Sequence, residues 1–196
     1  MLGSPRKKSI TLKAIDIVHE MGFQGLTTRE IAKREGISEA AIYRHFKNRD
    51  EVVAAVVAYY AKFDHSFVKS IGDLELSPFE SIVSLLGRMA AYYEEYPAIS
   101  SIMNAFDSMQ YDAAMAETTA GIYSFRKTTV EGLLRRAREE GALRRDIDPD
   151  LFSSILWSAF FSQVYEWRGC GCAFSLQERT AAAIGMLLRL ATEKTG

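Results

Sequence analysis

The chain has 196 residues, of which 48% are hydrophobic and 25% are charged, and this composition excludes a disordered protein. The formal net charge of −1 is unevenly distributed, because residues 1–50 carry +4 and the remaining residues carry −5. This asymmetry favours a basic segment that meets nucleic acid, followed by an acidic body.

The first predicted elements are short helices with clear ends. Apolar residues between Ser9 and Met21 recur with helical spacing and predict a helix that Gly22 ends. Thr28 is expected to cap a second, short helix, because its hydroxyl can accept from a free N–H group of the first turn. Gly36 is expected to end that helix after about two turns.

A third short helix is predicted over residues 39–46, with Ser38 as its cap. Ile31, Ile42 and Phe46 are expected to face inward. Two capped short helices joined by a turn that contains glycine are typical of a helix-turn-helix, whose second helix enters the major groove of DNA. Because α-proteins that never meet DNA also contain this arrangement, spacing alone leaves DNA binding open.

The rest of the chain predicts helices, because no stretch alternates apolar and polar residues as a strand does. Glu131 and Arg135 are expected to pair across one helical turn on the solvent side. The predicted helices lie at residues 48–70, 78–96, 98–109, 118–140, 150–168 and 176–193. The sequence thus predicts an all-α fold of about nine helices, with a three-helix DNA-binding domain at residues 1–50 and a ligand-binding and dimerisation domain at residues 51–196.

Residues 26–57, LTTREIAKREGISEAAIYRHFKNRDEVVAAVV, resemble the signature of TetR-type transcriptional regulators. The resemblance implies that the partner is double-stranded operator DNA. It also implies phosphate contacts, which position the protein, and base contacts, which read the sequence. The phosphate contacts would come from Thr28, Tyr43, His45 and Lys47, and the base contacts from Glu39, Ala40, Ala41 and Arg44. Together with the cap Ser38, these residues form the predicted DNA-binding set.

The chain departs from the family at one point of this set. Many members have Lys-Gly-Thr where this chain has Glu39-Ala40-Ala41, so we do not expect a common operator sequence. Arg44 is expected to pair with guanine, and the alanine methyl groups are expected to touch thymine methyl groups. The N-terminal cations Arg6, Lys7 and Lys8 are expected along phosphates or in the minor groove.

The resemblance also implies a homodimer and a small-molecule effector. The helices at residues 150–168 and 176–193 are expected to pair with those of a second copy in a four-helix bundle. The alternative is that they only complete the core of the monomer. A ligand pocket is expected between them and the DNA-binding domain, although each lining residue is also a plausible core residue. The predicted lining residues are Met89, Tyr92, Tyr93, Tyr96, Met103, Asn104, Phe106, Tyr123, Arg126 and Phe160.

Two functions remain open at this point. The first is a repressor that a small apolar or amphipathic molecule releases from a pseudo-palindromic operator. The alternative is a nucleoid-associated DNA-binding protein that a protein partner controls. An enzyme is not expected, because the chain contains no phosphate-binding loop, nucleophile elbow, zinc-protease motif or dinucleotide motif.

No cofactor or metal is expected. Cys170 and Cys172 would allow a redox switch or a metal clip, but further ligands are missing nearby, and two cysteines are too few for a disulfide framework. The longest apolar run, residues 52–61, is about half as long as a membrane span, and no signal-peptide core follows the basic start. We therefore expect a cytoplasmic protein.

Overall fold

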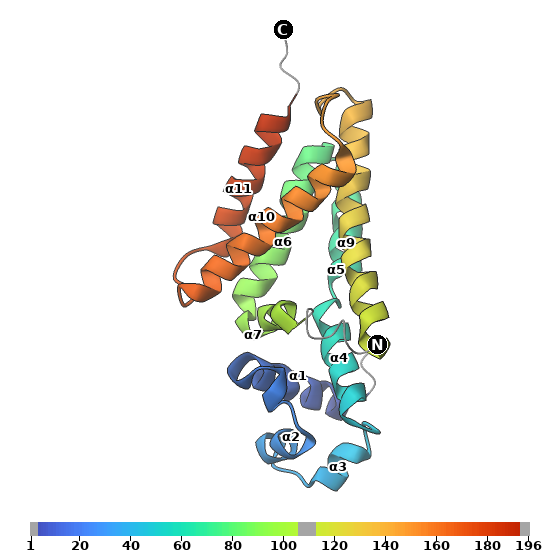
Figure 1. Ribbon diagram of the computed structural model, residues 1–196, viewed down its shortest axis with the longest axis vertical. Coiled ribbons are helices and arrows are strands. Elements are labelled where there is room, and N and C mark those ends of the chain that lie inside the picture. The colour runs from blue at the N-terminus through green and yellow to red at the C-terminus, as the bar shows by residue number, and fades with distance from the viewer. Residues whose placement is uncertain (1–3, 106–112, 193–196) are drawn as a thin grey trace. The chain divides into compact units, whose positions relative to one another are not determined.

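The computed structural model describes residues 4–105 and 113–192, and these residues form helices without any strand. The all-α prediction is confirmed (Figure 1). The chain divides into two compact units, one made of Met1–Lys62 and Tyr96–Gly121 and the other of Phe63–Glu95 and Ile122–Gly196. The predicted domain boundary at residue 50 stays a prediction.

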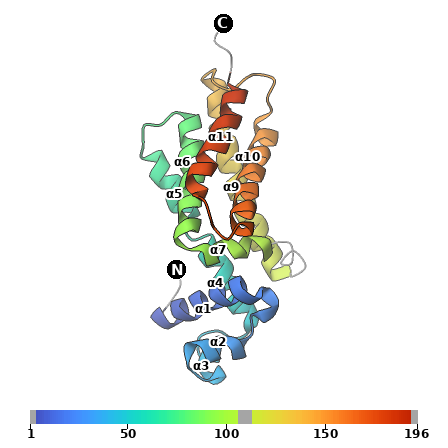
Figure 2. The same cartoon turned by 90° about the vertical axis from the view of Figure 1, so that its left-hand side faces the viewer.

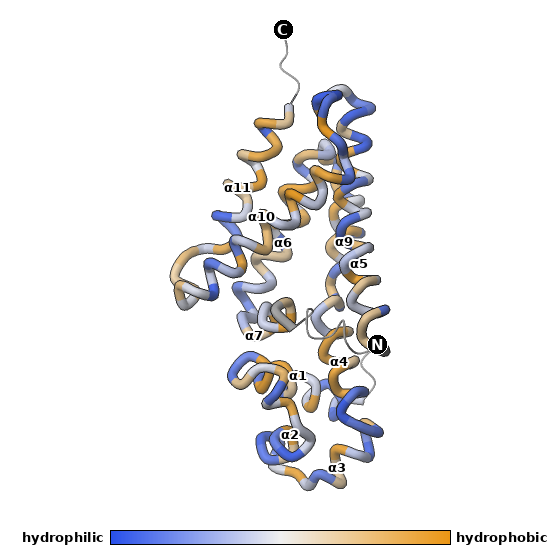
Figure 3. The backbone as a smooth tube through the Cα atoms, in the orientation of Figure 1, coloured by the Kyte–Doolittle hydropathy of each residue, from blue (hydrophilic) through white to orange (hydrophobic). Residues whose placement is uncertain are grey.

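The first unit contains the predicted helix-turn-helix. Its helices are α1 (Pro5–Met21), α2 (Thr28–Glu35), α3 (Glu39–Tyr43), α4 (Arg49–Tyr60) and α7 (Pro97–Ser100), with short 3-10 helices at Phe23–Gly25 and Ser101–Ala105. α1 packs on both α2 and α4, and Figure 3 shows that α4 is largely hydrophobic whereas α2 is largely hydrophilic. The core of this packing consists of Ile10, Ala14, Ile17, Val18, Ile31, Val52 and Val56, all buried.

The second unit is a bundle of longer helices. It contains α5 (Asp64–Gly72), α6 (Pro78–Glu95), most of α9 (Ala113–Glu139), α10 (Pro149–Gly169) and α11 (Leu176–Ala191). α11 packs against both α6 and α10 (Figure 2). The side chains that fill this bundle are fully buried and include Ile82, Leu86, Phe160, Val164 and Ile184. The predicted pair of Glu131 and Arg135 is confirmed, with 2.9 Å between Arg135 Nε and Glu131 Oε1.

Several predicted helix boundaries were wrong. The helix predicted over residues 48–70 is broken between Tyr60 and Asp64, because Asp64 begins a new helix and pairs with an arginine of α9. Within the helix predicted over residues 98–109, the described part is one α-helical turn that ends at Ser100, followed by a 3-10 helix over Ser101–Ala105, and residues 106–109 lie outside the described residues. The spacing of apolar residues does not predict the break before Asp64 or the 3-10 helix after Ser100, because it contains no information on contacts distant in sequence.

The cap of α2 is also corrected. Thr27, not Thr28, is the N-cap, and its hydroxyl accepts from the Glu30 N–H at 3.1 Å. The second of two adjacent threonines therefore lies inside the first turn, where its hydroxyl is available for other contacts. α3 ends at Tyr43 rather than at Phe46, and the chain then turns so that the Phe46 ring is buried.

Candidate nucleic-acid interface

The turn between α2 and α3 depends on Gly36. Its φ of 66° and ψ of 33° lie in the left-handed region, and its N–H donates to Lys33 O at 3.3 Å. The following N–H, that of Ile37, donates to Ala32 O at 3.0 Å. These bonds satisfy carbonyls at the end of α2, and a side chain at position 36 would strain this backbone conformation. The turn thereby fixes the direction of α3.

α3 exposes one face and buries the other. The Ser38 hydroxyl accepts from the Ala41 N–H at 3.2 Å and caps the helix as predicted. Ile42 is fully buried and Phe46 is buried beside it, whereas the predicted base-contacting residues Glu39, Ala40 and Arg44 are exposed. Ala41 is partly buried. The helix therefore presents a short polar and methyl-bearing surface to solvent.

Three residues of the predicted DNA-binding set meet on the outer surface of the first unit. Thr28 Oγ1 lies 3.5 Å from Glu39 Oε2 and 3.4 Å from the Tyr43 hydroxyl, so hydroxyl and carboxylate groups from α2 and α3 form one cluster. Tyr43 is half exposed. A carboxylate in this cluster disfavours a phosphate next to it, but it can accept a hydrogen bond from the amino group of cytosine.

The residues that follow α3 include an exposed cation, Lys47. The side chain of Lys47 is 89% exposed, and its only close acidic neighbour among the described residues is Glu51, at 3.7 Å from Nζ. The Lys47 backbone N–H donates to the Glu51 carboxylate at 2.9 Å. His45 is partly buried. An exposed lysine held by its backbone is suited to a phosphate contact.

Arg49 is a structural residue that the sequence interpretation missed. Its guanidinium donates to Leu26 O at 2.7 Å and to Phe23 O at 2.9 Å, and thereby ties the start of α4 to the loop before α2. The helix dipole disfavours a cation in the first turn of a helix. An arginine at this position is therefore a sequence signal that its side chain has a specific partner.

The N-terminal cations have partners within the protein. Arg6 NH1 lies 3.1 Å from Glu35 Oε2, and the Lys7 ammonium lies 5.2 Å from the centre of the Phe46 ring. Lys8 is exposed. Arg34 also binds within the first unit, since its hydrogen bond to Glu30 lowers the pKa of that carboxyl. The pair of Arg6 and Glu35 fastens α1 to α2.

α10 and α11 both bury one apolar face and expose another. On α10, Leu151, Ile155 and Tyr165 are exposed, and their spacings of four and ten residues, close to one and three helical turns, place them on one side of the helix. On α11, Met186 and Leu190 are exposed in the same way, and Leu190 is 68% exposed. Apolar residues lined up on two packed helices are typical of a surface that another protein covers.

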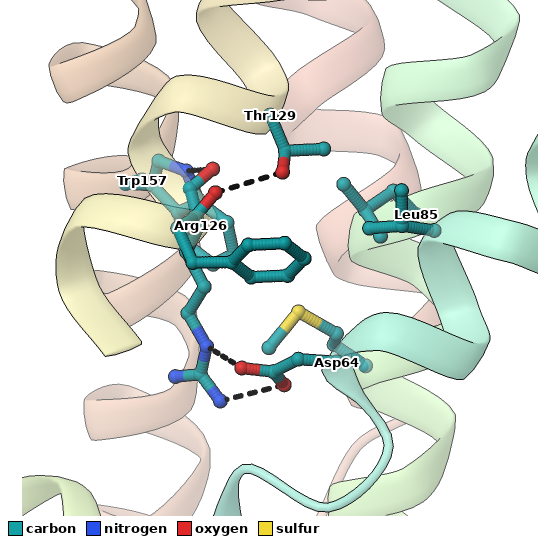
Figure 4. A pocket seen from close by; sticks show the side chains of 8 residues that line it. Asp64, Leu85, Arg126, Thr129 and Trp157 are labelled. Atoms are coloured by element: carbon teal, nitrogen blue, oxygen red, sulfur yellow. Dashed lines mark hydrogen bonds and ion pairs between the residues drawn. The ribbon is translucent and has the colours of Figure 1, made fainter. Parts of the chain in front are cut away.

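The predicted ligand-lining residues lie in different places. Met89 and Arg126 border a cavity of about 10 Å³ (Figure 4), whereas Tyr93 and Phe160 pack together in the core with ring centres 5.9 Å apart. Tyr123 is half exposed. Tyr92 is partly buried in the second unit, and Tyr96 and Met103 belong to the first unit. The side chain of Asn104 and the whole of Phe106 lie outside the described residues.

Residues 10–56 match the model of the family described as "Bacterial regulatory proteins, tetR family". The chain therefore carries an N-terminal segment of the tetR regulator family. The match covers α2, α3 and the turn between them, where the exposed predicted contacts lie. The family resemblance inferred from the sequence is therefore confirmed.

Similar proteins extend the likeness beyond this segment. The nucleoid occlusion factor SlmA of Aliivibrio fischeri is 24% identical over 160 residues, which are 79% of this chain and 82% of that protein. The class C tetracycline repressor protein of Escherichia coli is 30% identical over 61 residues, which are 31% of this chain and 28% of that protein.

Solved structures of regulators share the fold of this chain. The ketosteroid regulator KstR2 of Mycobacterium tuberculosis has a TM-score of 0.83 at 20% identity and covers 99% of this chain and 98% of its own. The Bacillus subtilis regulator FadR, solved with stearoyl-CoA, has a TM-score of 0.79 at 15% identity and covers 92% of this chain and 97% of its own. At these identities the likeness shows the fold.

Among the described residues, membrane-spanning helices and metal-binding clusters are both absent. None of their helices is both long and apolar enough to cross a membrane. No group of three or more His, Cys, Asp or Glu side chains among them is placed to hold a metal ion. Cys170 and Cys172 are both exposed and free.

Proposed function

We propose that this regulator is a homodimeric repressor that binds a pseudo-palindromic operator and is released by a small apolar or amphipathic molecule. The observation that carries the proposal is the outward face of α3, which the buried residues Ile31, Ile42 and Phe46 support from behind. A helix presented in this way fits the major groove. We further propose a cytoplasmic location and no catalytic activity.

The proposed DNA contacts combine positioning and reading. Tyr43, Lys47 and His45 would contact phosphates, while Arg44 would pair with a guanine. The Thr28 hydroxyl would join the phosphate contacts, and Glu39 would accept from an amino group of a base. Because the exposed cations are few, operator affinity should depend on salt through a small number of released counterions.

Selection from random duplex DNA with the full-length chain tests this function. We expect enrichment of a sequence with two related half-sites about 34–36 Å apart, the spacing of successive major grooves on one side of the duplex. The selected duplex should bind at nanomolar concentration at physiological salt. If no duplex is enriched over the starting pool, the function is wrong.

The dimer is proposed to form through the exposed apolar face of α10 and α11. Replacing Leu190, which is 68% exposed on α11, with glutamate would bury two unpaired carboxylates in the interface. We expect Leu190→Glu to weaken dimerisation by roughly a hundredfold or more, because an unpaired buried charge costs about 2–5 kcal/mol. Analytical ultracentrifugation measures the change.

The matched control is Leu74→Glu, since Leu74 is also an exposed leucine but lies outside α10 and α11. This variant should remain dimeric, and both variants should keep the helical circular dichroism of the parent. A Leu190→Glu protein with the parent's dimer affinity would contradict the proposed interface.

A second candidate function is a nucleoid-associated protein that a protein partner controls. The likeness to SlmA over 79% of the chain supports it. The two candidates share the DNA-binding face and differ in the effector. Saturable binding of a small molecule to the second unit would favour the repressor.

A further inference from the structure

A buried ion pair lies in the second unit. The Arg126 guanidinium of α9 donates through Nε to Asp64 Oδ2 at 2.7 Å and through NH2 to Asp64 Oδ1 at 3.0 Å (Figure 4). The two side chains are only 5% and 7% exposed. This two-point geometry is the one in which arginine binds a carboxylate most strongly. Arg126 is thus preformed to hold a carboxylate away from water.

The surroundings of the pair are apolar. The adjoining cavity is lined by the pair itself, by the Thr129 hydroxyl, and by Val68, Leu85, Met89, Phe125 and Trp157. Its volume of about 10 Å³ is room for one water molecule at most. Well-packed apolar side chains of similar volume stabilise a protein at least as well as a buried ion pair does. Stability alone therefore does not account for the charges.

Only one side-chain layer separates this cavity from solvent at one side. The ring of Phe125 lines the cavity and is partly exposed, and it packs on the exposed ring of His65 with 4.1 Å between ring centres. His65 and Phe125 are the chain neighbours of Asp64 and Arg126. Rotation of these two rings would open a route from solvent to the guanidinium without unfolding either helix.

The position of Asp64 lowers the free energy needed to separate it from Arg126. It lies in the first turn of α5, whose N-terminus has no side-chain cap. A carboxylate in the first turn is stabilised by the helix dipole and by free N–H groups. These interactions offset part of the cost of an Asp64 carboxylate without its arginine.

We propose that Arg126 anchors the carboxylate of an amphipathic monocarboxylate, which replaces Asp64. Because the cavity has room for one water molecule at most, the apolar or aromatic body enters only when the side chains around it repack, and the flexible thioether of Met89 favours such repacking. This inference rests on the proposed function, since the monocarboxylate would be the effector. A phosphate fits less well than a carboxylate, because it has additional oxygens and more negative charge. Apart from the ion pair, the side chains that line the cavity are uncharged, and the Thr129 hydroxyl is the one further donor among them. Trp157 reports on the site, since its indole N–H donates to Arg126 O at 3.0 Å.

The test compares acids with uncharged molecules of the same shape. The probes are decanoate with 1-decanol, and 4-phenylbutyrate with 4-phenyl-1-butanol, added to the full-length chain and followed by equilibrium dialysis and tryptophan fluorescence. We expect at least one acid to bind saturably and at least about tenfold more tightly than its alcohol, a difference of about 1.4 kcal/mol. Asp64→Asn should raise the affinity for that acid by a further tenfold or so, because the competing carboxylate is gone.

Two variants control the comparison. Arg135→Gln removes an exposed arginine of the same helix and should leave acid binding unchanged. The double variant Asp64→Leu with Arg126→Met replaces the pair by apolar residues and should abolish the preference for acid over alcohol. The proposal is overturned if neither acid binds saturably to the parent and Asp64→Asn, if acid and alcohol bind equally, or if decyl phosphate binds more tightly than decanoate.

Acid binding and operator binding are separate measurements, so they distinguish a wrong carboxylate site from a wrong proposed function. Operator binding is measured separately on the selected duplex. If the duplex is bound while no acid binds, the carboxylate site is wrong and the DNA-binding function stands. If acids bind with the expected preference while no duplex is enriched, the site stands and the repressor function falls.

Discussion

Replacing Tyr43 and Arg44 together by alanine is expected to weaken binding to the selected operator by roughly a hundredfold to a thousandfold. One well-paired arginine–guanine contact is worth about 1–3 kcal/mol, and loss of the Tyr43 hydroxyl removes a phosphate contact as well. A dimer loses these contacts in both half-sites. Fluorescence anisotropy of a labelled duplex at one fixed salt concentration measures the loss.

Stability should not change in this double variant, because both side chains are exposed on the first unit and neither belongs to its core. The control is Arg136→Ala, which removes an exposed arginine of α9 and should reduce operator affinity less than threefold or so. If the double variant holds the operator as tightly as the parent, α3 does not read the DNA.

The second large effect concerns the buried pair in the second unit. Arg126→Met should lower the free energy of unfolding by about 3–5 kcal/mol, because it leaves the Asp64 carboxylate buried without its cation. The double variant Asp64→Leu with Arg126→Met should recover most of this loss, since no charge then remains in the apolar surroundings. Urea denaturation of both variants and the parent measures the three free energies.

An exposed pair on the same helix is the control for this series. Arg135→Met breaks the ion pair with Glu131 at the surface and should lower the free energy of unfolding far less than Arg126→Met does. Should Arg126→Met be as stable as the parent, the pair carries no buried charge in solution, and the carboxylate site built on it would lose its basis.

The local features of the helix-turn-helix were predictable from the sequence. Ser38 caps α3, Gly36 takes the left-handed conformation, and Ile31, Ile42 and Phe46 are buried as the apolar spacing indicated. Each of these properties depends on residues within a few positions, so the sequence contains the necessary information. The Thr28 prediction failed by one residue because Thr27 can cap equally well and only the backbone geometry distinguishes them.

The features that failed depend on contacts across long stretches of sequence. The break before Asp64 reflects its pairing with Arg126, which lies 62 residues further along the chain. The ligand-lining set stays a prediction, and two of its members, Tyr93 and Phe160, pack their rings on each other in the core. Arg126 was in that set, but its partner Asp64 was not, because an aspartate inside the helix predicted over residues 48–70 gives no sign of burial.

The outward face of residues 38–47 is expected to lie in the major groove, and methylation interference on the selected duplex tests this placement most directly. We expect methylation of guanine N7, which faces the major groove, to block binding in two clusters about one helical turn apart. If guanine N7 methylation has no effect anywhere in the duplex, or if only adenine N3 methylation in the minor groove blocks binding, α3 does not enter the major groove.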